Sequence, residues 1–222
     1  MKTITFVRHG QSTANAGGVT MQHDIIPLSE LGRQHAQALA KLLPDRPSLI
    51  LTSEYLRAQH TAQPYCDRVG MAAQTHPLVH EFSTIDPVLL EGMDGEQRRP
   101  IADAYWLESD PAKRMGETAE TFIEFDQRVA AFQSQLHQLP DGSVLFGHGM
   151  WIGMLVWKLL GFGARDTIGM KAFRRFQLGL PMPNGAIYRL REAAPGRWFA
   201  SVDEAAMRTL LAVKTPPAPT IG

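Results

Sequence analysis

Four residues able to bind and transfer a phosphoryl group stand at the ends of short apolar segments of the chain. They are Arg8, His9, Arg57 and His148. The planar guanidinium of arginine stays charged and matches the oxygens of a phosphate dianion, so Arg8 and Arg57 suit anion binding. A neutral imidazole beside such cations is a competent nucleophile toward phosphorus, because nearby positive charge lowers its pKa. His148 could donate a hydrogen bond to the phosphoryl oxygens.

Each of these residues follows a segment that reads as a buried strand. Near-continuous apolar runs are typical of parallel strands covered on both faces. Arg8-His9 follow the first run, the segment from Ser53 to Arg57 follows the second, and His148 follows the third. Ligands bind beyond the carboxyl ends of the strands in open α/β sheets, so we expect these residues to converge. The three runs are residues 3–7, 49–52 and 143–147.

Helical patterns alternate with the strand patterns, which predicts a three-layer α/β/α sandwich with a mostly parallel central sheet. Ser29 and Ser53 are expected to be helix N-caps, whereas residues 81–116 contain too many Gly and Pro to show a period. Residues 1–213 are predicted to form a single domain, with 214–222 as a flexible tail. The expected helices are residues 30–43, 54–69, 117–139 and 149–160, and the further strands are 74–79, 186–190 and 198–202.

Composition excludes several classes of function. The 222 residues include 22 Lys plus Arg and 22 Asp plus Glu, so no global field recruits nucleic acid or an anionic membrane. The longest apolar stretch is too short for a bilayer span. Cys66 is the only cysteine, which rules out an internal disulfide and a multi-thiolate metal site. We expect a cytoplasmic protein that binds neither nucleic acid nor membranes.

Four ordered segments resemble the signature motifs of the histidine phosphatase superfamily, also called the phosphoglycerate mutase-like family. Arg8-His9-Gly10 alone is too short to be specific, but the order and spacing of all four are those of the family. Gln11 stands where many members carry Glu, and His60 where Gln is usual. The segments are Val7–Asn15, Pro27–Gly32, Ser53–Ala62 and Phe146–Gly149.

The resemblance implies the role of each site residue. His9 would be phosphorylated during turnover, while Arg8, Arg57 and His148 would form the phosphate pocket. A carboxylate after the third strand would protonate the leaving oxygen, and Glu81 stands where that acid is expected, with Asp86 and Glu91 as alternatives. Neither a metal nor another cofactor is implied. The residues expected to line the pocket are Gln11, Ser12, Asn15 and Gly149.

The function that the resemblance favours is hydrolysis of a phosphomonoester, because the longer substrate-binding insertions of the glycolytic mutases are missing. A bisphosphoglycerate-dependent mutase and a non-catalytic phosphate-binding module are the alternatives. The expected partner is a phosphorylated small molecule or a phosphoprotein, and a homodimer is considered because dimers are common in such families. Residues 83–116 are a candidate cap over the site. The other histidines are expected at the surface or in packing, with His23 considered as a pocket residue but not favoured.

Overall fold

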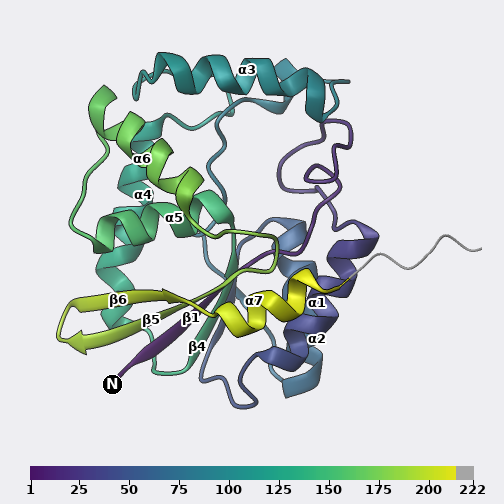
Figure 1. Cartoon of the computed structure of the whole chain (residues 1–222), viewed down its shortest axis with the longest axis vertical. Helices are drawn as coiled ribbons and strands as arrows, with labels where there is room; N and C mark the ends of the chain where they lie inside the picture. Colours follow the sequence, from purple (N-terminus) through teal and green to yellow (C-terminus); the bar gives the residue numbers. More distant parts are fainter. Residues whose placement is uncertain (214–222) are drawn as a thin grey trace, which may run out of the picture.

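A six-stranded sheet in the order β3-β2-β4-β1-β5-β6 forms the middle layer of the computed structural model, which describes residues 1–213 (Figure 1). The first four strands are parallel, whereas β5 runs antiparallel to β1 and pairs with β6 in a hairpin. The strands are β1 (Thr3–Arg8), β2 (Ile50–Thr52), β3 (Gln74–Thr75), β4 (Ser143–Gly147), β5 (Ile187–Ala194) and β6 (Arg197–Val202). The predicted fold class is confirmed. The prediction of a flexible tail at 214–222 lies outside the described residues.

Helices cover both faces of this sheet. Side chains alternate along a strand, so Ile4 and Phe6 of β1 belong to one apolar cluster and Val7 to the other. The first cluster lies under α4 (Phe122–Gln135), α5 (Gly149–Leu159) and α6 (Thr167–Gly179). The second lies under α1 (Glu30–Leu42), α2 (Leu56–Val69) and α7 (Glu204–Leu211). This arrangement fixes the sheet on both sides and leaves the strand ends as the place for a site.

Of the two predicted helix N-caps, Ser29 is confirmed and Ser53 is not. Ser29 caps α1 as predicted, since its side chain accepts a hydrogen bond from the backbone N–H of Gly32. The expectation that Ser53 caps the next helix is wrong, because α2 starts at Leu56 with Tyr55 as its N-cap. The Ser53 hydroxyl instead accepts from the N–H of Tyr55 and lies beside His148. Ser53 therefore belongs to the strand-end loop.

Two further elements are shorter than their sequence patterns predicted. The expected helix over 117–139 begins at Phe122, because Thr121 and Glu124 form a reciprocal capping box there. It ends at Gln135, and a 3₁₀ helix, η2 (Leu136–Gln138), follows. The expected strand over 74–79 pairs with β2 only at Gln74 and Thr75.

The irregular sequence at 83–116 contains a helix that its Gly and Pro residues concealed. A 3₁₀ helix, η1 (Pro87–Leu90), is followed by α3 (Gly95–Glu108), which lies apart from the sheet at the top of Figure 1. Tyr105 is the one buried residue of α3, so no apolar stripe marks it, and Pro100 falls inside it. Within residues 1–213, no helix combines the length and the apolar character needed to cross a bilayer.

Candidate active site

The carboxyl ends of β1, β4 and β2 lie next to one another, because these three parallel strands are neighbours in the sheet. This juxtaposition brings together the residues that the motifs separate by as many as 140 positions. A cavity of about 210 Å³ lies at this edge. Its lining includes Arg8, His9, Ser12, Asn15, Arg57 and Glu81.

His9 is a buried, neutral imidazole with a defined tautomer. Its Nδ1 lies 2.6 Å from the carbonyl oxygen of Gly10. Because a carbonyl can only accept, Nδ1 must carry the proton, which leaves the lone pair on Nε2. The Nε–H of Arg57 donates to that Nε2 over 3.2 Å. Burial, followed by the charges of Arg57 and Arg8, holds the pKa of His9 well below its ordinary value.

Each of the two arginines donates to a backbone carbonyl, and both line the cavity. Nη1 of Arg8 donates to the carbonyl of Met182, and Nη1 of Arg57 donates to that of His23 over 2.6 Å. The guanidinium of Arg57 also stacks on the ring of Tyr55, 4.8 Å from its centroid. Burial lowers the pKa of both arginines.

His148 faces His9 across the end of the sheet, with ring centroids 5.2 Å apart. It is fully buried, and burial together with the charge of Arg57 holds its pKa well below the ordinary value. Its Nε2 lies 2.8 Å from the hydroxyl oxygen of Ser53, whereas its Nδ1 has no partner among the described residues. Nε of Arg8 is also buried without a partner. Unpartnered buried polar atoms are rare, so two at one site indicate that a polar ligand completes it.

Glu81 is held at the amino end of α5. Its two carboxylate oxygens accept from the backbone N–H groups of Met150 and Trp151, over 3.1 and 3.0 Å, and its own neighbour Phe82 donates to it over 3.0 Å. The carboxylate thus lines the cavity in a fixed orientation. Of the three candidate acids, Glu81 is the one that lines the same cavity as His9.

The alternative acids have other surroundings. The carboxylate of Asp86 accepts from the backbone N–H groups of Val88 and Thr118, which lowers its pKa and ties the loop together. Glu91 is exposed at the end of η1. Neither lines the cavity that holds His9.

Two of the expected pocket residues line the cavity, and two support it from outside. Ser12 and Asn15 line it and hydrogen-bond each other through reciprocal side-chain to backbone contacts. The side chain of Gln11 instead accepts from the hydroxyl of Ser29, outside the cavity lining. Gly149 packs against Arg8, since a Cβ there would lie 3.0 Å from Nε of the arginine.

Sequence reasoning missed two residues of the site. His23 lines the cavity, and burial together with Arg57 lowers its pKa to about 4, so it is neutral at physiological pH. Asn184 donates to the side-chain oxygen of Asn15 over 2.9 Å and so holds the loop that follows His9. His23 precedes the Pro27–Gly32 motif, whereas the pair Asn184-Gly185 is in itself only typical of a turn.

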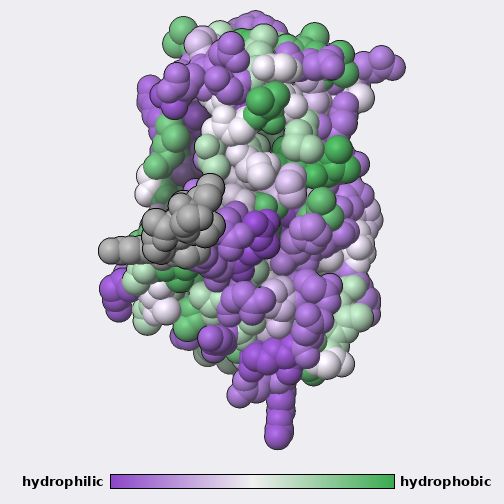
Figure 2. All heavy atoms as spheres, turned by 90° about the vertical axis from the view of Figure 1, so that its right-hand side faces the viewer, coloured by the Kyte–Doolittle hydropathy of each residue, from purple (hydrophilic) through white to green (hydrophobic). Residues whose placement is uncertain are grey.

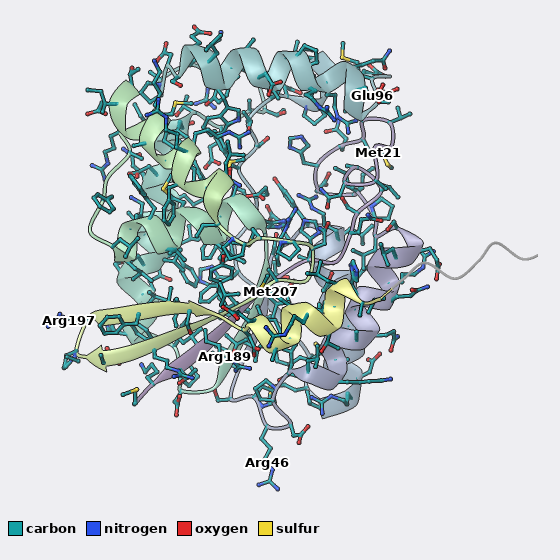
Figure 3. All side chains as sticks on the ribbon, in the orientation of Figure 1. Met21, Arg46, Glu96, Arg189, Arg197 and Met207 are labelled. Atoms are coloured by element: carbon teal, nitrogen blue, oxygen red, sulfur yellow. The ribbon has the colours of Figure 1, made fainter. Side chains whose placement is uncertain are left out.

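The segment 83–116 lies next to the site and to the loop after His9. A second cavity of about 220 Å³ shares His23 and Phe82 with the first and is also lined by Ile85, Leu90 and residues of α3. The amino end of α3 lies beside the loop after His9, where the N–H of Gly95 donates to the carbonyl of Gly17. Figure 3 shows this proximity by the labelled side chains of Met21 and Glu96. Within the described residues, no three His, Cys, Asp or Glu side chains are grouped to hold a metal ion.

Comparison with known proteins places these features in a family. The profile of the histidine phosphatase superfamily (branch 1) matches residues 4–202. An adenosylcobalamin/alpha-ribazole phosphatase from Salmonella typhi is 29% identical over 164 residues, which cover 72% of this chain and 81% of that protein. A probable phosphoglycerate mutase, GpmB, from Yersinia enterocolitica is 28% identical over 167 residues, covering 72% and 76%.

Solved structures share the fold. A putative alpha-ribazole-5'-P phosphatase from Escherichia coli superposes with a TM-score of 0.72 at 22% identity, covering 90% of this chain and 95% of the other. A mycobacterial glucosyl-3-phosphoglycerate phosphatase superposes with a TM-score of 0.68 at 24% identity, covering 90% and 97%. At these identities the likeness concerns the fold.

Proposed function

Because the chain belongs to the histidine phosphatase superfamily (branch 1), we propose that it is a metal-independent phosphatase acting through a phosphohistidine intermediate on His9. One observation carries the proposal: a buried, neutral His9 has its Nε2 lone pair beside Arg57 in a cavity that Glu81 also lines. Such an arrangement supplies a nucleophile, an anion-binding cation and an acid within one site.

In the first step Nε2 of His9 attacks phosphorus and the bond to the leaving oxygen breaks. Glu81, in its protonated form, gives a proton to that oxygen, because an alkoxide is a poor leaving group. The attack leaves the imidazole ring positively charged, and the Gly10 carbonyl that accepts from Nδ1 stabilises it. Arg8, Arg57 and the Nδ1–H of His148 bind the phosphoryl oxygens in this scheme.

In the second step water attacks the phosphohistidine. Glu81 is now a carboxylate and takes a proton from the water, while the bond between phosphorus and Nε2 breaks. Inorganic phosphate leaves, and His9 returns to its neutral form with the proton still on Nδ1. Atoms and charges balance without a metal ion.

The surroundings of the cavity support a substrate with a sizeable leaving group. His23 also lines a third cavity of about 250 Å³, so two further cavities share this residue with the cavity that holds His9. Four exposed apolar residues are next in sequence to residues that line these cavities. They are Met21, Ile25, Val88 and Leu89. Figure 2, which views the molecule from the right-hand side of Figure 1, shows apolar side chains among polar ones in its upper part. We propose a phosphorylated small metabolite as the first class to test and a phosphoprotein as the second.

The relatives that carry the name of probable phosphoglycerate mutase support a second candidate function. A mutase would isomerise 3-phosphoglycerate only after priming with a bisphosphate, and it would release little free phosphate. A phosphatase would release phosphate from one or more phosphomonoesters without priming.

The test is phosphate release from a panel of phosphorylated metabolites and phosphopeptides, run beside the primed mutase assay. We expect release from at least one metabolite and its loss in His9→Ala. Primed isomerisation with little phosphate release would favour the mutase. Inactivity across both assays would contradict either catalytic function.

A further inference from the structure

Ser53 and His148 form a buried pair at the ends of neighbouring strands. In the parallel register of β2 and β4, Thr52 lies opposite Phe146, which brings the residues that follow the two strands side by side. The side chains of Ser53 and His148 are both fully buried. The hydroxyl oxygen of Ser53 lies 2.8 Å from Nε2 of His148 and also accepts from the backbone N–H of Tyr55 over 3.2 Å.

The direction of the hydrogen bond in this pair follows from counting donors and acceptors. If Nε2 of His148 donated to Ser53, the serine proton would have no acceptor among the described residues, and the bare Nδ1 would be buried without a donor. If Ser53 donates to Nε2, every polar group of the pair is satisfied except the Nδ1–H. Leaving fewer buried groups unsatisfied is strongly favoured, so the second arrangement applies.

The tautomer matters because this imidazole carries a single proton. Burial and the charge of Arg57 keep the pKa of His148 well below its ordinary value, so the ring is neutral at physiological pH. Its proton is either on Nδ1, where it can be donated to an anion, or on Nε2, where it cannot. With the proton on Nε2, a lone pair would face the phosphoryl oxygens and repel them.

We propose that Ser53 is a positioning residue that donates its hydroxyl proton to Nε2 of His148 and thereby keeps the imidazole proton on Nδ1. The unpartnered Nδ1–H is then a preformed donor for an anion. The binding of a phosphoryl group by this N–H rests on the proposed phosphatase function, whereas the position of the proton on the ring is independent of that function. Nδ1 of His148 and Nε of Arg8 are the two unpartnered buried nitrogens among the described residues, which is the arrangement expected of an anion site.

The direct test is the nitrogen NMR spectrum of histidine-labelled wild-type protein at pH 7, with the His148 signals assigned by their loss in His148→Gln. We expect a protonated Nδ1 and an unprotonated Nε2. The opposite tautomer in the wild type would overturn the proposal, and this result does not depend on any enzymatic activity. A protein with the expected tautomer but no phosphatase activity would refute the proposed function alone.

Ser53→Ala tests the role of the hydroxyl. We expect the variant to populate the Nε2–H tautomer, to bind orthovanadate about tenfold more weakly and to lose about tenfold or more in kcat. Ser53→Thr, which keeps a hydroxyl, should restore the Nδ1–H tautomer. An Ala variant with an unchanged tautomer and unchanged vanadate affinity would contradict the proposal.

Ser143→Ala is the matched control. Ser143 is as buried as Ser53, and its hydroxyl donates to the carbonyl of Pro140 over 2.7 Å, at the start of β4 and away from the site. This variant loses one buried serine hydroxyl without touching a histidine. It should keep the wild-type tautomer and vanadate affinity, so equal losses in both variants would reveal a general effect of the mutation and overturn the specific role.

Discussion

The Nε–H of Arg57 donates to Nε2 of His9 over 3.2 Å, so the cation expected to bind phosphate also covers the lone pair expected to attack it. The contact orients the imidazole in the free protein, and burial together with the charge of Arg57 keeps it unprotonated by lowering its pKa. A bound phosphoryl group offers Arg57 better acceptors than a neutral nitrogen. Arrival of the substrate would therefore turn this donor toward the phosphoryl oxygens and release the nucleophile.

Arg57→Ala tests this coupling. Loss of the cation should raise the pKa of His9, because the charge of Arg57 now lowers it, and should reduce kcat/KM by about 10²–10³ through the lost stabilisation of the phosphoryl oxygens. The acid limb of the pH profile of kcat/KM should move to higher pH. Arg68→Ala is the control, since Arg68 lies on the same helix and stacks on Tyr65 away from the site. A limb that stays in place would contradict the coupling.

Glu81→Gln tests the identity of the acid. We expect a loss of about 10²–10⁴ in kcat for alkyl phosphates, whose leaving oxygen needs a proton, and a smaller loss in the phosphoryl-transfer step from nitrophenyl phosphate. The comparison with Asp86→Asn decides between the candidates. That variant should lower the melting temperature, because Asp86 accepts from Val88 and Thr118, while folded molecules keep their rate constants. The reverse pattern would assign the acid to Asp86.

Gly149→Ala should disturb Arg8. An added methyl group would lie 3.0 Å from its Nε and 3.2 Å from Cγ of Met182, so the guanidinium must shift. We expect KM to rise about tenfold, as a binding loss of roughly 1.4 kcal/mol would produce. Gly153→Ala on the same helix is the matched control, because its methyl group would make ordinary contacts of 3.4 and 3.5 Å. Equal kinetic effects in both variants would show that the helix, and not Arg8, is affected.

Acidification should destabilise the protein through its buried histidines. The folded-state pKa values of His9 and His148 lie well below 6.5, and that of His23 is about 4. Between these values and 6.5 the unfolded chain binds more protons than the folded one, so stability falls as pH falls. At pH 5 the loss is roughly 2 kcal/mol for each histidine that stays neutral.

Urea denaturation between pH 7.5 and 5 measures this dependence. His23→Gln should reduce the pH dependence of the unfolding free energy by about one proton relative to the wild type, because it removes one group that is protonated in the unfolded chain and neutral in the folded one. A free energy of unfolding that is constant or increases on acidification would contradict the assignment of neutral buried histidines.

The residues proposed to carry the chemistry could be selected from the sequence because their positions in the sequence and in the fold are tied together. Arg8, His9 and His148 directly end or follow buried strands, and the parallel sheet brings such positions to one edge. Apolar residues of the runs that predicted the strands contribute to both core clusters. The family resemblance is confirmed by the profile match over residues 4–202.

The features that could not be predicted from the sequence depend on contacts between segments that are far apart along the chain. α3 has one buried residue and an internal proline, so it carries no apolar stripe. It is held instead by the packing of Tyr105 and Trp106 against Phe82 and by the hydrogen bond from Gly95 to the loop after His9. Gln11 is predicted to line the pocket, but its side chain accepts a hydrogen bond from the hydroxyl of Ser29 instead. Gly32 allows this close approach, since a Cβ there would lie 1.9 Å from the carbonyl oxygen of Gln11. Local patterns carry no signal for such pairings.

The phosphohistidine on His9 is tested most directly by rapid quench of Glu81→Gln with radiolabelled nitrophenyl phosphate. The leaving group needs little protonation and the variant lacks the base that activates water, so the intermediate should accumulate. We predict acid-labile, base-stable label on the peptide that contains His9, and its absence when His9→Ala is added. Turnover without any labelled peptide, or label that persists in the double variant, would contradict the central claim.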